Sequence, residues 1–264
     1  MGEVIVVTSG KGGVGKTTTT ANIGTGLAAL GHKVVLVDAD IGLRNLDVVL
    51  GLENRIVYDI VDATSGNCRL RQAIIRDKHL EGLHLLPAAQ TKDKTAVSTD
   101  QMEELCDELK REFEYVLVDC PAGIEQGFKN AIAGADKSIV VTTPEVSAVR
   151  DADRIIGLLE AAELRDPKLV INRLRVRMVK AGDMMSIDDM LDILAIDLLG
   201  VVPEDDQVVI STNKGEPVVV DEKSLSGQAY RNIVKRIKGE DVPLMDMDND
   251  SGLITTLRRL IGLK

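Results

Sequence analysis

The sequence predicts an α/β fold, a doubly wound and mainly parallel sheet flanked by helices, with a short amphipathic helix at the C-terminal end. Three observations predict it. Short aliphatic runs alternate with helical patterns, a glycine-rich loop joins the first run to the first helix, and two later runs end in aspartates. Runs that are apolar throughout are typical of strands covered on both faces, and such strands form parallel sheets.

The predicted elements follow one another in βα order from residue 4 to about residue 238. We expect the strands at residues 4–8, 33–38, 82–86, 115–119, 137–142, 168–172 and 197–202. We expect the helices at residues 16–30, 98–113, 126–133, 147–162, 186–194 and 223–237. No repeat or low-complexity linker divides this pattern. Residues 1–240 are therefore predicted to form one domain, residues 241–250 an acidic linker and residues 251–264 a terminal helix.

Composition and charge argue against nucleic-acid binding. The 264 residues include 42 acidic and 32 basic side chains, which gives a formal net charge of −10. The chain has no Trp, three Tyr and two Phe. An acidic chain with so few aromatic side chains is not expected to bind nucleic acid.

The cysteines indicate a reducing compartment. Cys68, Cys106 and Cys120 are odd in number and form no C-x-x-C pair, so neither a disulfide framework nor a zinc site is expected. The first residues lack the basic region of a signal peptide. The expected location is the cytoplasm, or the stroma if the protein belongs to a plastid.

The glycine-rich loop predicts a P-loop NTPase. Residues 10–17 match the pattern G-x-x-x-x-G-K-[ST] between a predicted strand and a predicted helix. Backbone N–H groups of such a loop surround phosphate oxygens, Lys16 supplies charge near the β- and γ-phosphates, and the Thr17 hydroxyl can ligate Mg²⁺. The candidate nucleotide-binding residues of this loop are Gly10, Lys11, Gly12, Gly13, Val14, Gly15, Lys16, Thr17 and Thr18.

Lys11 is a second lysine in the same loop. Lys16 already contacts the terminal phosphates in such a loop. Lys11 is therefore available to reach the nucleotide phosphates of a neighbouring subunit, as an arginine finger does in trans. The alternative is an ordinary solvated lysine.

Three aspartates follow predicted strands, where an α/β sheet places its ligand crevice. Asp119 ends an aliphatic run as the acid of a Walker B strand does. Asp38 and Asp40 are candidates for positioning water and for contacting the metal through water. The candidate metal residues are thus Thr17, Asp38 and Asp119, with Mg²⁺ as the ion. The alternative for any one aspartate is a turn or helix cap.

These motifs resemble the deviant Walker A ATPases of the ParA/MinD family, whose loop reads K-G-G-x-G-K-[ST]. The resemblance covers nearly the whole chain and is carried by residues 8–18, 38–47, 86–94, 119–125, 144–153, 200–205 and 215–217. It implies an ATPase that closes as a homodimer around ATP and Mg²⁺. The implied catalytic residues are Lys11 acting across the dimer, Lys16 on the phosphates, Asp40 positioning the hydrolytic water, and Asn45 assisting it.

The resemblance also implies two further contacts. Asp119 would act on the metal through water, and Asn172 looks like the family's contact with adenine. The helix that carries Arg150, Asp151 and Asp153 resembles the surface on which family members meet a MinE-like activator and a MinC-like inhibitor. Without the resemblance, these charges indicate only a solvated helix face.

The C-terminal segment, residues 251–264, has three basic and no acidic residues. At about 100° per residue its aliphatic side chains share one face and its arginines lie opposite, which is typical of a helix in a membrane interface. The candidate membrane residues are Leu253, Ile254, Leu257, Arg258, Arg259, Leu260 and Ile261. The alternative from periodicity is a terminal helix packed on its own domain or on a partner; the resemblance favours an anionic membrane surface.

The leading hypothesis is an ATPase switch that places the division site of a cell or plastid. Mg-ATP closes the homodimer, the paired tails bind the inner face of the cell membrane or the plastid inner membrane, and hydrolysis releases both. A ParA-like DNA-partitioning ATPase is a rival that the acidic charge and the tail disfavour. A MinD-like regulator of flagellar position is not separated by the sequence. An iron–sulfur carrier of the superfamily lacks its paired cysteines here.

Overall fold

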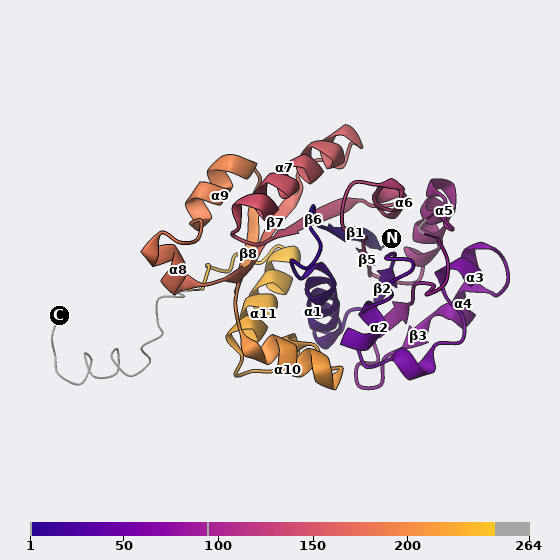
Figure 1. Cartoon of the computed structure of the whole chain (residues 1–264). Helices are drawn as coiled ribbons and strands as arrows, with labels where there is room; N and C mark the ends of the chain where they lie inside the picture. The colour runs from indigo at the N-terminus through magenta and orange to yellow at the C-terminus, as the bar shows by residue number, and fades with distance from the viewer. Residues whose placement is uncertain (1, 94, 246–264) are drawn as a thin grey trace.

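The structure is a computed structural model that describes residues 2–93 and 95–245 (Figure 1). In this part of the chain eight strands form one sheet in the order β3-β4-β2-β5-β1-β6-β7-β8. Their bounds are β1 Glu3–Thr8, β2 Val34–Asp38, β3 Ile75–Arg76, β4 Leu83–Leu86, β5 Tyr115–Asp119, β6 Lys137–Thr142, β7 Lys168–Leu174 and β8 Leu198–Pro203. All neighbouring strands are parallel except β3 and β4, which are antiparallel.

The predicted doubly wound, mainly parallel sheet is confirmed, and all seven predicted strands are present. The sequence did not predict β3, because two residues carry no periodic signal. The predicted C-terminal helix, with all its candidate membrane residues, lies outside the described residues. In the described part, no helix is long and apolar enough to cross a membrane.

Six helices correspond to those predicted: α1 Lys16–Ala29, α5 Thr99–Leu109, α6 Gln126–Ala133, α7 Val146–Ala161, α9 Ile187–Leu194 and α11 Leu225–Ile237. Other elements were not predicted. These are α2 Leu46–Val49, α3 Ile60–Thr64, α4 Leu70–Ala73, α8 Val176–Ala181, α10 Asp206–Lys214, and the 3-10 helices η1 Glu53–Arg55 and η2 Val218–Val220. Those of three to six residues show too few turns for periodicity, and the nine-residue helix α10 has no buried residue.

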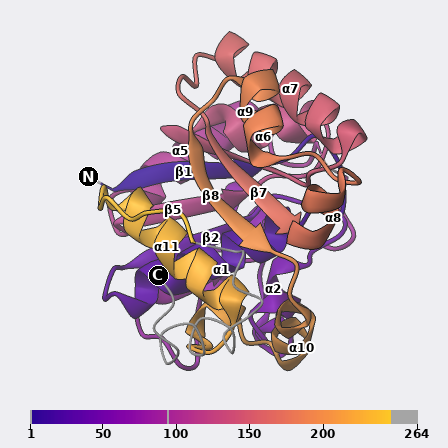
Figure 2. The same ribbon diagram turned by 90° about the vertical axis from the view of Figure 1, so that its left-hand side faces the viewer.

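Two hydrophobic clusters lie on opposite faces of the sheet, because successive strand residues point to opposite sides. Along β1, Val4 and Val6 enter the first cluster, whereas Ile5 and Val7 enter the second. The first cluster packs under α5, α6, α7 and α9, and the second under α1 and α11 (Figure 2). Burial on both faces explains why the strands are apolar throughout.

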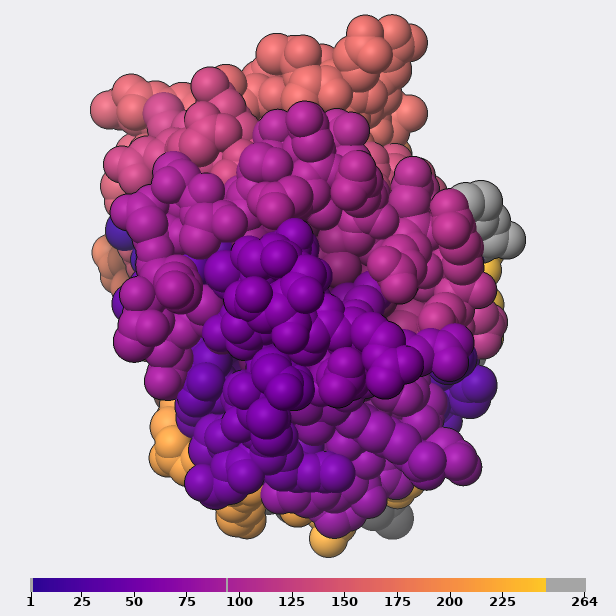
Figure 3. Space-filling model, turned by 90° about the vertical axis from the view of Figure 1, so that its right-hand side faces the viewer, coloured from indigo at the N-terminus to yellow at the C-terminus, as the bar shows by residue number. Residues whose placement is uncertain are grey.

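The two edges of the sheet are covered differently. At the β3 edge, the chain between β2 and β5 forms the surface (Figure 3). At the β8 edge, the Arg236 guanidinium donates to the carbonyl of Leu199 at 2.9 Å and to the carbonyls of Val242 and Pro243 at 3.0 and 2.9 Å. Met245 then packs against the second cluster. The chain beyond α11 is therefore fastened to the edge strand.

Candidate nucleotide-binding site

The P-loop joins β1 to α1 at the carboxyl end of the sheet. Because β2, β5 and β1 are neighbours, the parallel strands bring this loop together with the residues that come after Asp38 and Asp119. Gly15 precedes α1 with a φ of 95°, in the left-handed region, and no side chain caps this end of the helix. The first N–H groups of α1 thus remain available to an anion, as phosphate binding requires.

Gly10 is required by packing. A Cβ there would lie 2.2 Å from the backbone oxygen of Asp151 in α7. The P-loop and α7 are therefore in direct backbone contact, although they are far apart in the sequence.

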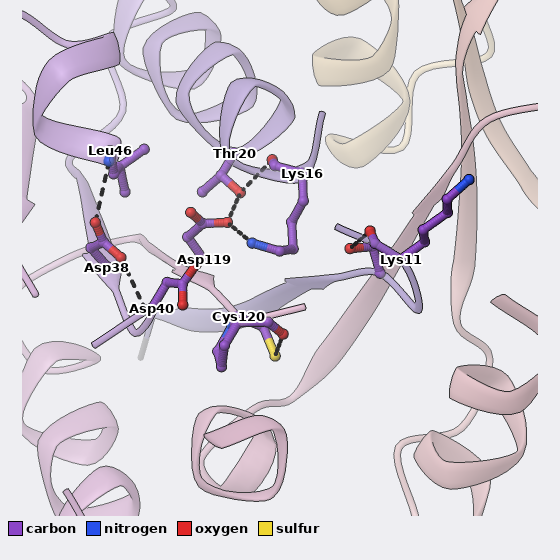
Figure 4. Close-up of polar contacts among 10 residues, drawn as sticks. Lys11, Lys16, Thr20, Asp38, Asp40, Leu46, Asp119 and Cys120 are labelled. Atoms are coloured by element: carbon purple, nitrogen blue, oxygen red, sulfur yellow. Dashed lines mark hydrogen bonds and ion pairs between the residues drawn. The ribbon is translucent and has the colours of Figure 1, made fainter. Parts of the chain in front are cut away.

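Lys16 is buried against Asp119. Its Nζ lies 3.0 Å from Asp119 Oδ1, and both side chains are almost fully buried (Figure 4). Burial alone lowers the pKa of Lys16, but Asp119 together with Cys120 and Asp40 outweighs this effect, so that the pKa is raised and the ammonium stays charged. Thr20 Oγ1, which the sequence did not single out, lies 3.2 Å from the same oxygen.

The second carboxylate oxygen of Asp119 is a candidate for contact with a metal ion through water. Asp119 Oδ2 is buried and has no hydrogen-bond partner among the described residues. A buried carboxylate oxygen without a donor fits a water on a bound cation. In the same part of the chain, no group of three or more His, Cys, Asp or Glu is arranged to hold a metal alone. Mg²⁺ is bound mainly by phosphates, waters and one or two side chains, and Thr17 is the candidate side chain here.

Asp38 is fully buried and faces the start of the next loop. Its Oδ1 accepts from the backbone N–H of Asp40 at 3.0 Å, and its Oδ2 accepts from that of Leu46 at 3.2 Å. Burial and the neighbouring Asp119 raise the pKa of Asp38 to about 7. Both oxygens thus hold the ends of the loop that carries Asp40 and Asn45, a function that the sequence did not predict; contact with the metal through water stays a prediction.

Asn45 is exposed at the position preceding α2, and its side chain does not cap that helix. Asp40 is half-buried beside Lys16 and Asp119 (Figure 4). The loop therefore places Asp40 beside the P-loop lysine and leaves the Asn45 side chain exposed.

Lys11 lies away from Lys16 (Figure 4). Its Nζ is 3.1 Å from Glu145 Oε2 and 3.1 Å from Ser147 Oγ, at the start of α7. The side chain is 41% exposed. In this structure Lys11 therefore belongs to the P-loop but not to the phosphate site of its own chain. Glu145 and Ser147 are a pairing that the sequence could not reveal, because 134 residues separate Lys11 from Glu145.

Asn172 ends the continuous buried run of β7 and braces the P-loop. Its Nδ2 donates to the carbonyl of Val14 at 2.8 Å, and its Oδ1 accepts from the N–H of Arg173 at 3.0 Å. One N–H hydrogen and one oxygen lone pair of the Asn172 amide remain unused, so the side chain can still form hydrogen bonds with a nucleobase. A cavity of about 710 Å³ opens next to it, lined by Arg173, Glu204 and Met178 among others.

The three predicted partner residues lie on α7. Arg150 and Asp153 are exposed, and Asp151 is half-buried. They begin one turn after the contacts of Lys11, on the helix that Gly10 touches.

A model of the CobQ/CobB/MinD/ParA nucleotide binding domain matches residues 5–218. The chain belongs to this family. Membership in the CobQ/CobB/MinD/ParA family confirms the resemblance, the P-loop fold and the prediction of a bound nucleotide.

Individual members of the CobQ/CobB/MinD/ParA family are similar over nearly their whole length. The chain is 58% identical over 267 residues to the septum site-determining protein MinD of Bacillus subtilis (strain 168), with 100% of both chains covered. The MinC:MinD cell division protein complex of Aquifex aeolicus matches with a TM-score of 0.87 and 50% identity, over 92% of this chain and 99% of that one. MinD from Pyrococcus horikoshii OT3, complexed with Mg-ADP, matches with a TM-score of 0.82 and 30% identity, over 90% and 96%.

Proposed function

We propose that this chain is a Mg-ATP-dependent switch that places the division site of its cell or plastid. It closes as a homodimer on ATP, binds membrane through its C-terminal segment, recruits a MinC-like inhibitor and is released by hydrolysis under a MinE-like activator. The observation that carries the proposal is the contrast between two lysines of one loop: Lys16 is buried on Asp119, whereas Lys11 is directed away on α7.

The named relatives support the cellular role. The Bacillus subtilis relative is a septum site-determining protein, and the Aquifex aeolicus structure is a complex with MinC. The Pyrococcus horikoshii relative holds Mg-ADP. With this P-loop and Asp119, ATP and Mg²⁺ are the cofactors proposed here.

Phosphates are bound by the free N–H groups at the start of α1 and by the Lys16 ammonium. Thr17 would hold Mg²⁺ directly and Asp119 through water; when bound, the ion neutralises charge on the β- and γ-phosphates. Asp40 and Asn45 orient the attacking water, and the loop that carries them is fixed at both ends by Asp38.

Lys11 completes the site of the opposite subunit. To do so it leaves Glu145 and Ser147. The Lys11–Glu145 pair is largely exposed, and exposed ion pairs are worth at most about 1 kcal/mol. Contact with a partner's phosphate exceeds this, because charge-assisted hydrogen bonds in a closed site are stronger. Since α7 carries the partner residues, the movement of Lys11 changes the surface beside them.

Membrane binding is assigned to residues 251–264, on the inner face of the cell membrane or of the plastid inner membrane. One tail of six aliphatic side chains binds weakly, because ordering the segment offsets most of the burial energy. Two tails in one ATP-closed dimer gain avidity of ~10²–10⁴-fold.

Vesicle co-sedimentation of the full chain tests the switch. With phosphatidylglycerol-containing vesicles we expect strong sedimentation with ATP and little with ADP. Asp40→Ala is expected to remain bound while hydrolysing ATP at a reduced, measurable rate. Leu257→Asp is expected to abolish binding. Its matched control is Thr255→Asp, which adds the same charge on the opposite face of the predicted helix. Equal sedimentation with ATP and ADP would rule out the switch.

A further inference from the structure

The loop between β2 and α2 has a second set of contacts besides those of Asp38. Leu43 and Arg44 donate their N–H groups to the carbonyl of Asp40 at 3.1 and 3.2 Å. Gly42 donates to the carbonyl of Ala89, in the loop after β4, at 2.8 Å. The backbone around Asp40 is therefore tied both to itself and to the neighbouring strand's loop.

Arg44 adopts an unusual backbone conformation at the centre of this loop. Its φ is 45°, in the left-handed region that a residue with a long side chain rarely adopts. Such conformations persist when the surroundings hold them, and they gather at functional sites. The contacts of the Arg44 side chain explain how its backbone conformation is held.

The Arg44 guanidinium bridges two segments. Its Nε lies 3.0 Å from Asp47 Oδ2, and Asp47 is 1% exposed. With its amide oxygen turned toward the guanidinium, Gln90 accepts from Nε at 3.3 Å and from a terminal nitrogen at 3.0 Å. Asp47 belongs to α2, and Gln90 lies in the loop after β4. The other carboxylate oxygen of Asp47 has no partner among the described residues, so Arg44 is the principal partner of a buried carboxylate.

We propose that Arg44 is a positioning residue for hydrolysis, which fixes the Asp40 loop by bridging Asp47 and Gln90. The proposal rests on the function proposed above, in which Asp40 orients water. Arg44 acts through the loop and does not itself touch the nucleotide in this assignment. An arginine suits the task because its planar fork serves two acceptors at once, whereas a lysine ammonium is a point charge without that geometry.

Steady-state and single-turnover hydrolysis of the full chain test the proposal. We expect Arg44→Ala to lower kcat ~10–100-fold, since a displacement of about 1 Å in a reacting geometry costs on this order. Nucleotide affinity should change less than about threefold, because the P-loop is untouched. Arg44→Lys should fall between wild type and Arg44→Ala, and Gln90→Ala should also lower kcat.

The matched control is Arg71→Ala. Arg71 donates from Nε and a second nitrogen to Glu112 at 2.9 and 2.8 Å, so this variant also removes a forked arginine pair, but away from the loop. It should retain full kcat. Thermal unfolding of each variant separates positioning from loss of fold, because an Arg44→Lys variant that is folded and slow supports positioning.

Combination with Asp40→Ala gives the decisive measurement. If Arg44 acts through Asp40, the double variant hydrolyses ATP no more slowly than Asp40→Ala alone. Multiplicative losses, or full kcat in Arg44→Ala, would overturn the assignment. A wild-type chain without ATPase activity would instead overturn the function proposed above. The two failures are therefore distinguishable.

Discussion

Substitution of Asn172 by alanine separates two roles of one side chain. The side chain joins β7 to the P-loop through Val14 and also holds the N–H of Arg173, at 2.8 and 3.0 Å. Each hydrogen bond contributes about 0.5–1.5 kcal/mol net, and both are lost, so Asn172→Ala should lower the free energy of unfolding by roughly 1–3 kcal/mol without nucleotide. Urea unfolding at unchanged m-value measures this.

Nucleotide binding by the same variant decides whether Asn172 also contacts the base. If it does, Asn172→Ala loses preference for ATP over GTP in a displacement assay with a fluorescent nucleotide. If it only braces the loop, affinity for ATP, GTP and pyrophosphate falls by a common factor. Asn213→Ala, on exposed α10, is the control and should change neither quantity. An unfolding free energy within about 0.5 kcal/mol of wild type would refute the bracing.

Three further outcomes are expected from contacts in the structure. Asp119→Ala should lower the free energy of unfolding by ~3–5 kcal/mol in urea titration, because the Lys16 ammonium stays buried without its partner. Glu145→Ala should change it by less than about 1 kcal/mol, since the pair is exposed, while favouring ATP-dependent dimerisation on size exclusion because Lys11 is released. Thiol labelling at pH 8 should modify Cys68 first in the native protein and all three cysteines in denaturant. Burial raises the pKa of Cys106 and of Cys120 to about 12. At pH 8 only about one in ten thousand of these thiols is therefore ionised to the reactive thiolate.

The sequence predicted the central architecture because its signals are local. An apolar run such as that of β1 is read without knowledge of its neighbours, and a P-loop is a contiguous motif. The region between residues 39 and 75 was not predicted, because α2, α3 and α4 are short and are held by long-range packing. α10 has no buried residue, which removes the amphipathic pattern on which helix prediction depends.

The structure brings some of the predicted site residues together, but their orientations could not be predicted from the sequence. Lys16 and Asp119 lie together as their motifs require. The direction of Lys11, the use of both Asp38 oxygens within the loop and the bridge from Arg44 to Gln90 depend on residues brought together by folding. A sequence motif identifies the side chain that reacts, whereas the residues that orient this side chain are distant from it in the sequence.

The Arg236 fastening at the β8 edge sets the length of the tether to the C-terminal segment. From Ile237, thirteen residues (238–250) precede the predicted terminal helix, an extended reach of about 45 Å. From Met245, which is packed on the domain, only five remain, a reach of about 18 Å. The contacts of Arg236 and Met245 together thus shorten the tether more than twofold. Under the proposed membrane binding, the P-loop domain would be held within this reach of the surface that the terminal segment binds.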